Sequence, residues 1–188
     1  MGTTTPDWDS LYQVAASQDG YFTPKQSQKA GYSPQLLNKY IHSGKLVHIR
    51  RGVYRIIHFP PSDHEDLTVI WLWSHRQGVF SHETALALHE LSDVLPKNIH
   101  LTLPSHDFKR RLRVPSGVEL HFGDISGHHR QWFGCVPITS PAKALNDCAT
   151  AFVSPDLLFQ AVAEGRARGL FRPQEISPTS RYLSEFDE

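Results

Sequence analysis

Residues 20–57 hold four lysines and three arginines but no aspartate or glutamate. The whole chain of 188 residues has zero formal net charge, so this segment carries seven net positive charges and the remainder seven net negative ones. Such a separation of charge is typical of a protein in which one part contacts a polyanion and the rest does not. The charge pattern therefore indicates nucleic acid as a partner of this segment.

Two short helices joined by a tight turn are predicted within the same segment. A hydroxyl residue stands directly before a proline at positions 23–24 and again at 33–34. A hydroxyl can cap a helix, and the fixed φ of proline suits the first helical turn. We therefore expect helices over about 24–30 and 34–43, each followed by a glycine that can adopt positive φ.

The second of these helices is predicted to have a buried face and a polar face. Leu37, Tyr40 and Ile41 recur at helical spacing and should face a core. The opposite face carries the residues that we predict to read bases, which are Gln35, Asn38, Lys39 and His42. Asn and Gln pair in bidentate fashion with adenine, and Lys reaches guanine or a phosphate, so this face suits a major-groove recognition helix.

A β-hairpin is predicted after the second helix, because the apolar pattern alternates over 46–50 and 53–57 with Gly52 in the turn. A helix predicted over 8–18 would supply the third helix of a winged helix-turn-helix. Basic side chains are candidates for contact with phosphates or the minor groove: Lys25, Lys45, Arg50, Arg51 and Arg55. The alternative is a protein–protein module whose basic side chains are only solvated; the missing acidic residues favour DNA.

A proline-containing linker at 58–62 is predicted to separate two domains. The predicted fold class is α+β. It comprises a winged helix-turn-helix over 1–60, a small mixed α/β domain over 63–170 and a polar, fraying tail over 171–188. In the second domain we expect strands at 98–103, 118–123 and 135–138, and helices at 64–76, 82–90, 141–150 and 155–168.

Neither a metal site nor an enzyme active site is predicted. His82 and His89 would lie two turns apart on one helix, which is not the spacing of a ligand pair, and His128-His129 is read as an ordinary loop pair. No convergent set of catalytic side chains is found, so we predict no catalysis and no cofactor. Cys135 and Cys148 are expected to be reduced, buried thiols. The basic run 109–113 is either a solvated loop or a second phosphate contact.

Four stretches of the chain resemble the AbiEi-type antitoxins, which regulate bacterial type IV toxin–antitoxin operons. They are GYFTPKQSQKAGYSPQLLNKYIHSGKLVHIRRGVYRI, FSHETALALHEL, NIHLTLP and VPITSPAKALNDCA, and they occur in the order of the family. The resemblance covers about residues 10–170. It implies a DNA-binding repressor of its own operon, whose companion toxin is a nucleotidyltransferase-like protein that the antitoxin does not need to bind directly.

These observations predict a sequence-specific repressor that binds operator repeats in double-stranded DNA. The alternative, from another class, is an interaction module that neutralises a partner through its C-terminal domain. The chain contains neither a signal-peptide pattern nor a run of about 18 apolar residues, so we expect a cytoplasmic protein without a membrane partner.

Overall fold

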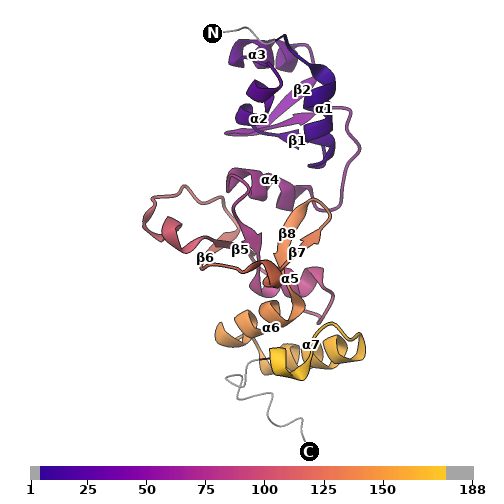
Figure 1. Ribbon diagram of the computed structural model, residues 1–188, viewed down its shortest axis with the longest axis vertical. Coiled ribbons are helices and arrows are strands. Elements are labelled where there is room, and N and C mark those ends of the chain that lie inside the picture. The colour runs from indigo at the N-terminus through magenta and orange to yellow at the C-terminus, as the bar shows by residue number, and fades with distance from the viewer. Residues whose placement is uncertain (1–4, 177–188) are drawn as a thin grey trace, which may run out of the picture. The chain divides into compact units, whose positions relative to one another are not determined.

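The computed structural model describes residues 5–176, which form two compact units that meet between Arg76 and Gln77. The first unit contains four helices and a three-stranded antiparallel sheet in the order β1-β3-β2 (Figure 1). Its elements are α1 (Trp8–Ala16), β1 (Tyr21–Phe22), α2 (Pro24–Lys29), α3 (Pro34–His42), β2 (Leu46–Arg50), β3 (Val53–Ile56) and α4 (Glu65–Trp73).

Side-chain caps begin the first three helices where the sequence places them. Asp7 accepts a hydrogen bond from the backbone nitrogen of Ser10, and Ser33 accepts one from that of Leu36. Thr23 forms a capping box with Gln26. The predicted helices α2 and α3 and the predicted hairpin are therefore confirmed to within one residue at each end.

The core of the first unit lies between the helices and the small sheet. Leu11 of α1, Phe22 of β1, Leu37 of α3 and Leu46 of β2 are all buried in one apolar cluster. Full burial of a side chain of this size contributes about 1.5–3 kcal/mol, so these contacts fix α3 on the sheet. Strand β1 was not expected from the sequence, because its two residues give no readable alternation.

Helix α4 belongs to the first unit, whereas the sequence pattern assigned it to the second domain. Its first-turn residue Glu65 accepts hydrogen bonds from the Tyr21 hydroxyl and the Arg55 guanidinium, each at 2.8 Å. Thr68 also bonds the Asp19 carboxylate at 2.7 Å. The predicted boundary at 58–62 is thus corrected to Arg76, because long-range polar contacts hold α4 against the preceding strands.

The second unit is built on a five-stranded mixed sheet in the order β6-β5-β4-β8-β7. Strands β5 and β6 are parallel, as are β4 and β8, while the other two pairs are antiparallel. Its elements are β4 (Val79–Phe80), α5 (His82–Leu88), β5 (Ile99–Leu103), β6 (Val118–Phe122), β7 (Arg130–Phe133), β8 (Val136–Thr139), α6 (Pro141–Thr150) and α7 (Pro155–Ala167), with short 3-10 turns at Ser105–Lys109, Gly127–His129 and Pro173–Glu175.

Apart from α4, the helices and strands predicted for the second domain are present in the second unit, but two of its strands were missed. Strand β4 has only two residues, and β7 lies between the strands predicted at 118–123 and 135–138, where no strand was expected. The side chains of β7 are largely exposed, so they lack the apolar alternation that marks a strand. Antiparallel pairing with the buried strand β8 stabilises β7 instead.

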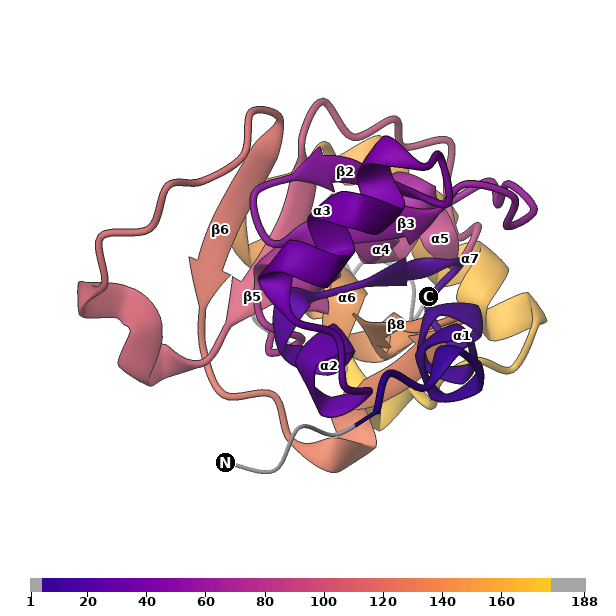
Figure 2. The ribbon, with the colours of Figure 1, turned by 90° about the horizontal axis from the view of Figure 1, so that it is seen from above.

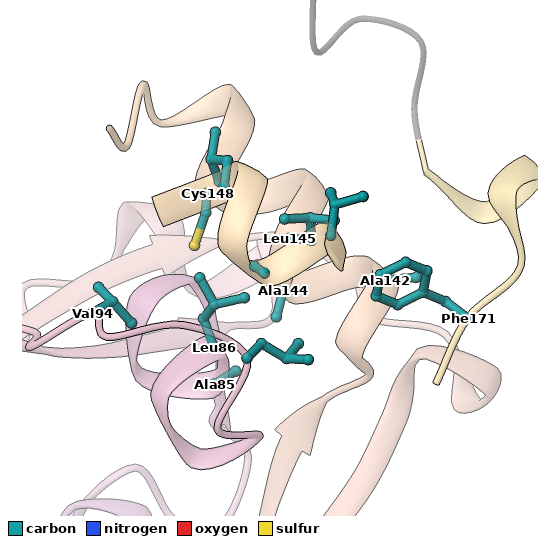
Figure 3. Close-up of a cluster of buried hydrophobic side chains, with 12 residues drawn as sticks. Ala85, Leu86, Val94, Ala142, Ala144, Leu145, Cys148 and Phe171 are labelled. Atoms are coloured by element: carbon teal, nitrogen blue, oxygen red, sulfur yellow. The ribbon is translucent and has the colours of Figure 1, made fainter. Parts of the chain in front are cut away.

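Helices α5, α6 and α7 follow one another away from the sheet (Figure 1), and their facing sides form the main core of the second unit. Figure 3 shows Leu86 of α5 close to Ala144 and Leu145 of α6. Phe171 packs into this cluster and is 8% exposed, so the core of the unit includes a residue beyond position 170. Of the predicted tail, residues 177–188 lie outside the described part of the chain.

Within residues 5–176, no helix has both the length and the apolar character needed to cross a membrane. Both cysteines in this range are free thiols, and Cys148 is buried while Cys135 is half-buried.

Candidate nucleic-acid interface

The structure places the four predicted base-reading side chains together on the outer face of α3. Gln35, Asn38, Lys39 and His42 are all exposed, whereas Leu37 is 3% exposed on the opposite face. His42 donates from Nδ1 to the backbone carbonyl of Asn38 at 2.7 Å, which directs its Nε2 away from the helix backbone. The arrangement offers amide, ammonium and imidazole groups to a ligand along a single helix face.

Aromatic side chains support α3 from behind. The ring of Tyr40 stacks on Trp8 of α1 at 5.8 Å between centroids and meets the edge of Tyr32 at 5.6 Å. The Lys45 ammonium lies over the same Tyr40 ring, 5.1 Å from its centroid. The exposed Lys45 is therefore held beside the C-terminal end of α3 rather than extending freely into solvent.

The hairpin turn presents two of the predicted phosphate contacts. Arg51 is exposed at the turn between β2 and β3, and Arg50 is half-buried at the end of β2. Gly52 has φ of 82°, a conformation that favours glycine, and a register irregularity between His48 and Arg50 precedes the turn. The turn geometry thus fixes both arginines at the tip of the hairpin.

Arg55 differs from the other predicted phosphate contacts. Its guanidinium donates to the Glu65 carboxylate at 2.8 Å and to the backbone carbonyl of Phe59 at 3.0 Å, and its side chain is only 14% exposed. It also lies over the ring of Tyr21 at 5.4 Å. These contacts occupy Arg55 inside the first unit, so we assign it a structural role and remove it from the predicted interface.

The carboxylate of Glu65 is itself held in the charged form. Burial would raise its pKa, but hydrogen bonds from Tyr21, Ser62 and Arg55 and the charge of Arg55 keep the pKa below its ordinary value. Burial, together with the hydrogen bond to this carboxylate, raises the pKa of Tyr21 to about 12. Tyr21 is therefore a neutral donor and Arg55 and Glu65 an ion pair at neutral pH.

A groove of about 570 Å³ adjoins the start of α2 and the hairpin turn. Its lining includes the predicted contacts Lys25 and Arg51, both exposed, and two basic residues that were not predicted, Lys29 and Arg76. Lys29 was counted in the basic segment but not selected as a contact. Arg76 follows α4, outside that segment, and only the packing of α4 brings it to the groove.

The basic run at 109–113 lies on an exposed stretch after the 3-10 turn in the second unit. Arg110 forms an ion pair with the buried carboxylate of Asp107 at 2.7 Å. Lys109, Arg111 and Arg113 are exposed, so the loop interpretation and the phosphate-contact interpretation both stay open for them.

Comparison with known proteins finds a family model that matches part of the first unit. Residues 9–57 match the family model described as a transcriptional regulator, AbiEi antitoxin. The fold of the chain is similar to the crystal structure of the RV2827C protein from Mycobacterium tuberculosis, with a TM-score of 0.53 and 18% identity over 98% of this chain and 78% of that one. None of the curated proteins matches the sequence. The resemblance to the AbiEi antitoxins is therefore confirmed for residues 9–57, which carry α1 to β3.

Proposed function

We propose that this protein is a sequence-specific DNA-binding repressor, an AbiEi-like type IV antitoxin that regulates its own toxin–antitoxin operon. The observation that carries the proposal is the exposed polar face of α3 beside a cationic hairpin, in a segment without acidic residues. In this reading α1, α2, α3 and the β2–β3 hairpin form a winged helix-turn-helix, with α3 as the recognition helix and the hairpin as the wing.

The two parts of this interface have different roles in the proposal. Gln35, Asn38, Lys39 and His42 lie in the major groove and distinguish base pairs through their edges. Lys25, Lys45, Arg50 and Arg51 neutralise phosphates and position the unit without reading sequence. Lys29 and Arg76 extend this phosphate-binding surface along the groove beside the hairpin turn.

The second unit has a supporting role in the proposal. A single small DNA-binding unit buries limited area and gives limited specificity, so operators with repeats are usually occupied by two or more copies. We propose that the second unit couples such copies or engages another macromolecule, without catalysis of its own. The companion toxin is a nucleotidyltransferase-like protein in the same cytoplasm, and neutralisation does not require a stable complex with it.

Binding to the DNA upstream of the gene tests the proposal. Fluorescence anisotropy with that DNA and with a random duplex should show a clear preference for the former. Asn38→Ala should weaken operator binding by about 1–3 kcal/mol and leave random binding almost unchanged, because a lost base contact is a specific term. Gln13→Ala, at an exposed polar position on α1, is the matched control and should change neither affinity.

Salt dependence separates the phosphate contacts from the base contacts. Arg51→Ala should weaken binding to both duplexes alike and reduce the slope of log K against log salt by about one unit. Lys97→Ala removes an equal charge from an exposed position of the second unit and should leave the slope unchanged. Equal affinity of the wild-type protein for operator and random DNA would contradict the repressor proposal and favour the interaction module.

A further inference from the structure

Three histidines that are far apart in the sequence come together in the second unit. One side-chain nitrogen from each of His82, His100 and His121 lies within 4.8 Å of the others. Nδ1 of His100 and Nε2 of His121 are 2.9 Å apart, and the rings of His82 and His121 stack with 3.6 Å between centroids. The cluster lies at one edge of a cavity of about 430 Å³, which His82 and His121 line.

The pleat of the sheet explains why two of these rings share a face. Strands β5 and β6 are parallel neighbours, as Figure 2 shows, with His100 opposite Glu119 and Thr102 opposite His121. Because alternate residues of a strand point to the same face, these four side chains lie on one side of the sheet. His100 and His121 are therefore diagonal neighbours in adjacent strands.

Helix α5 brings the third histidine to this face and is fixed there by hydrogen bonds. The backbone nitrogen of His100 donates to the Thr84 hydroxyl at 2.8 Å, and the hydroxyls of Ser81 and Thr102 are 2.7 Å apart. Both contacts join the start of α5 to β5. His82, the first residue of α5, is thus held above the strand pair by rigid elements.

The hydrogen-bond partners of the imidazole rings determine which ring nitrogens point toward one another. Glu83 lies 3.1 Å from Nε2 of His100 and can accept its proton, which leaves the Nδ1 lone pair directed toward His121. Ser81 lies 2.9 Å from Nδ1 of His82, which leaves Nε2 of that ring for another ligand. A carboxylate behind a histidine is the arrangement that orients metal-binding imidazoles in proteins.

The backbone at His82 adopts an uncommon conformation within this cluster. His82 has φ of 50°, which is a left-handed backbone conformation. Such conformations are uncommon in residues other than glycine and occur preferentially at functional sites. All three pairs of rings in the cluster are stacked, and His100 is only 8% exposed.

The charged groups around the cluster favour a cation. Glu83 contacts His100, and Glu119 lies 4.0 Å from His121, so two carboxylates border the rings. Lys143 and Asp147 line the same cavity and form an ion pair with each other, so their charges offset. The surroundings therefore carry a net negative charge next to three nitrogen ligands.

The geometry points to a transition-metal site formed by His82, His100 and His121, with Zn²⁺ as the ion that a three-imidazole set suits best. Glu83 acts as the partner that orients His100, and the cavity gives the ion a path and a fourth coordination position. Binding requires the imidazole rings to rotate, because all three pairs are stacked and stacked rings do not aim their nitrogens at one point. The bound ion would join α5, β5 and β6.

Sequence spacing alone predicted no metal site and paired His82 with His89. His89 instead ends α5, where its Nε2 donates to the backbone carbonyl of Thr139 at 2.7 Å. The three residues are 18 and 21 positions apart, and the register of β5 against β6 together with the hydrogen bonds between α5 and β5 brings them together. This site is independent of the proposed DNA interface, because all three histidines belong to the second unit.

Zinc titration of the full-length, untagged protein after treatment with a chelator tests the inference. Competition with a chromophoric chelator should show one Zn²⁺ per chain, and added Zn²⁺ should raise the melting temperature of the second unit. Co²⁺ should give visible absorption bands with the intensity of a four-coordinate site. Failure to bind one equivalent of either ion would refute the site.

Variants locate the bound ion. His100→Ala and His121→Ala should abolish stoichiometric binding, and Glu83→Gln should weaken it by about 10–100-fold. His128→Ala, at an exposed position of the 3-10 turn Gly127–His129, is the matched control and should bind as the wild type does. Undiminished binding by His121→Ala would overturn the assignment.

His121→Cys keeps the test decisive where an alanine variant fails to fold. A thiolate at this position should retain Co²⁺ and add a sulfur-to-metal charge-transfer band, because cysteine is also a ligand for this class of ion. A Co²⁺ spectrum identical to that of the wild type would place the ion elsewhere and contradict the site.

Discussion

Replacing Glu65 by glutamine tests whether α4 is part of the first unit. The carboxylate accepts hydrogen bonds from Tyr21 at 2.8 Å, Arg55 at 2.8 Å and the backbone nitrogen of Ser62 at 3.3 Å. The amide of glutamine can keep one of the two side-chain bonds but turns its NH₂ group toward the other partner. It also removes the charge that compensates a guanidinium only 14% exposed.

The expected loss lies between two known limits. Exposed ion pairs contribute about 0–1 kcal/mol, whereas breaking a fully buried pair costs about 3–5 kcal/mol. The side chain of Glu65 is 29% exposed, so solvent screens part of the interaction, and we expect Glu65→Gln to destabilise the first unit by about 2 kcal/mol. For a unit of this size that loss lowers the melting temperature by about 8–16 °C.

Asp66→Asn provides the matched control. Asp66 is the next residue in the first turn of α4, is exposed, and has the same favourable position relative to the helix dipole. Differential scanning calorimetry should show a large shift for Glu65→Gln and a small one for Asp66→Asn. Hydrogen exchange should show the lost protection in residues 20–57. Equal shifts for both variants would refute the proposed anchoring of α4 through Glu65.

Three further predictions follow from the same contacts and from the second core. A fragment of residues 1–76 should fold and bind DNA, whereas 1–60 should be largely unfolded by circular dichroism, because it lacks α4. Gly165→Ala should lower stability by about 1–3 kcal/mol in denaturant titration, since a Cβ there would overlap the ring of Phe171. The pKa of Glu65 is lowered on folding, so its stabilising contribution is present above the ordinary value of 4.5 and is lost as pH falls through the folded-state pKa. Acid unfolding of the wild type should therefore be steeper below about pH 4.5 than that of Glu65→Gln.

The sequence by itself determined the local structure of the first unit and the polar face of α3 that we propose reads bases. Caps, prolines and glycines act within a few residues, so the positions of α2, α3 and the hairpin could be predicted closely. The same holds for the exposed face of α3, because helical periodicity fixes which side chains lie opposite the buried Leu37.

The tertiary structure determined the features that depend on contacts between residues far apart in the sequence. Arg55 and Arg51 belong to the same basic segment, which contains no acidic residue. Only the ion pair with Glu65 distinguishes Arg55, because it holds the guanidinium inside the first unit. The boundary at Arg76 and the two missed strands also depend on distant contacts. Strand pairing and helix packing cannot be recognised from the residue pattern of a short stretch. His82, His100 and His121 come together because of the register of β5 against β6 and the packing of α5 on these strands. The spacing of the three residues along the chain does not reveal either feature.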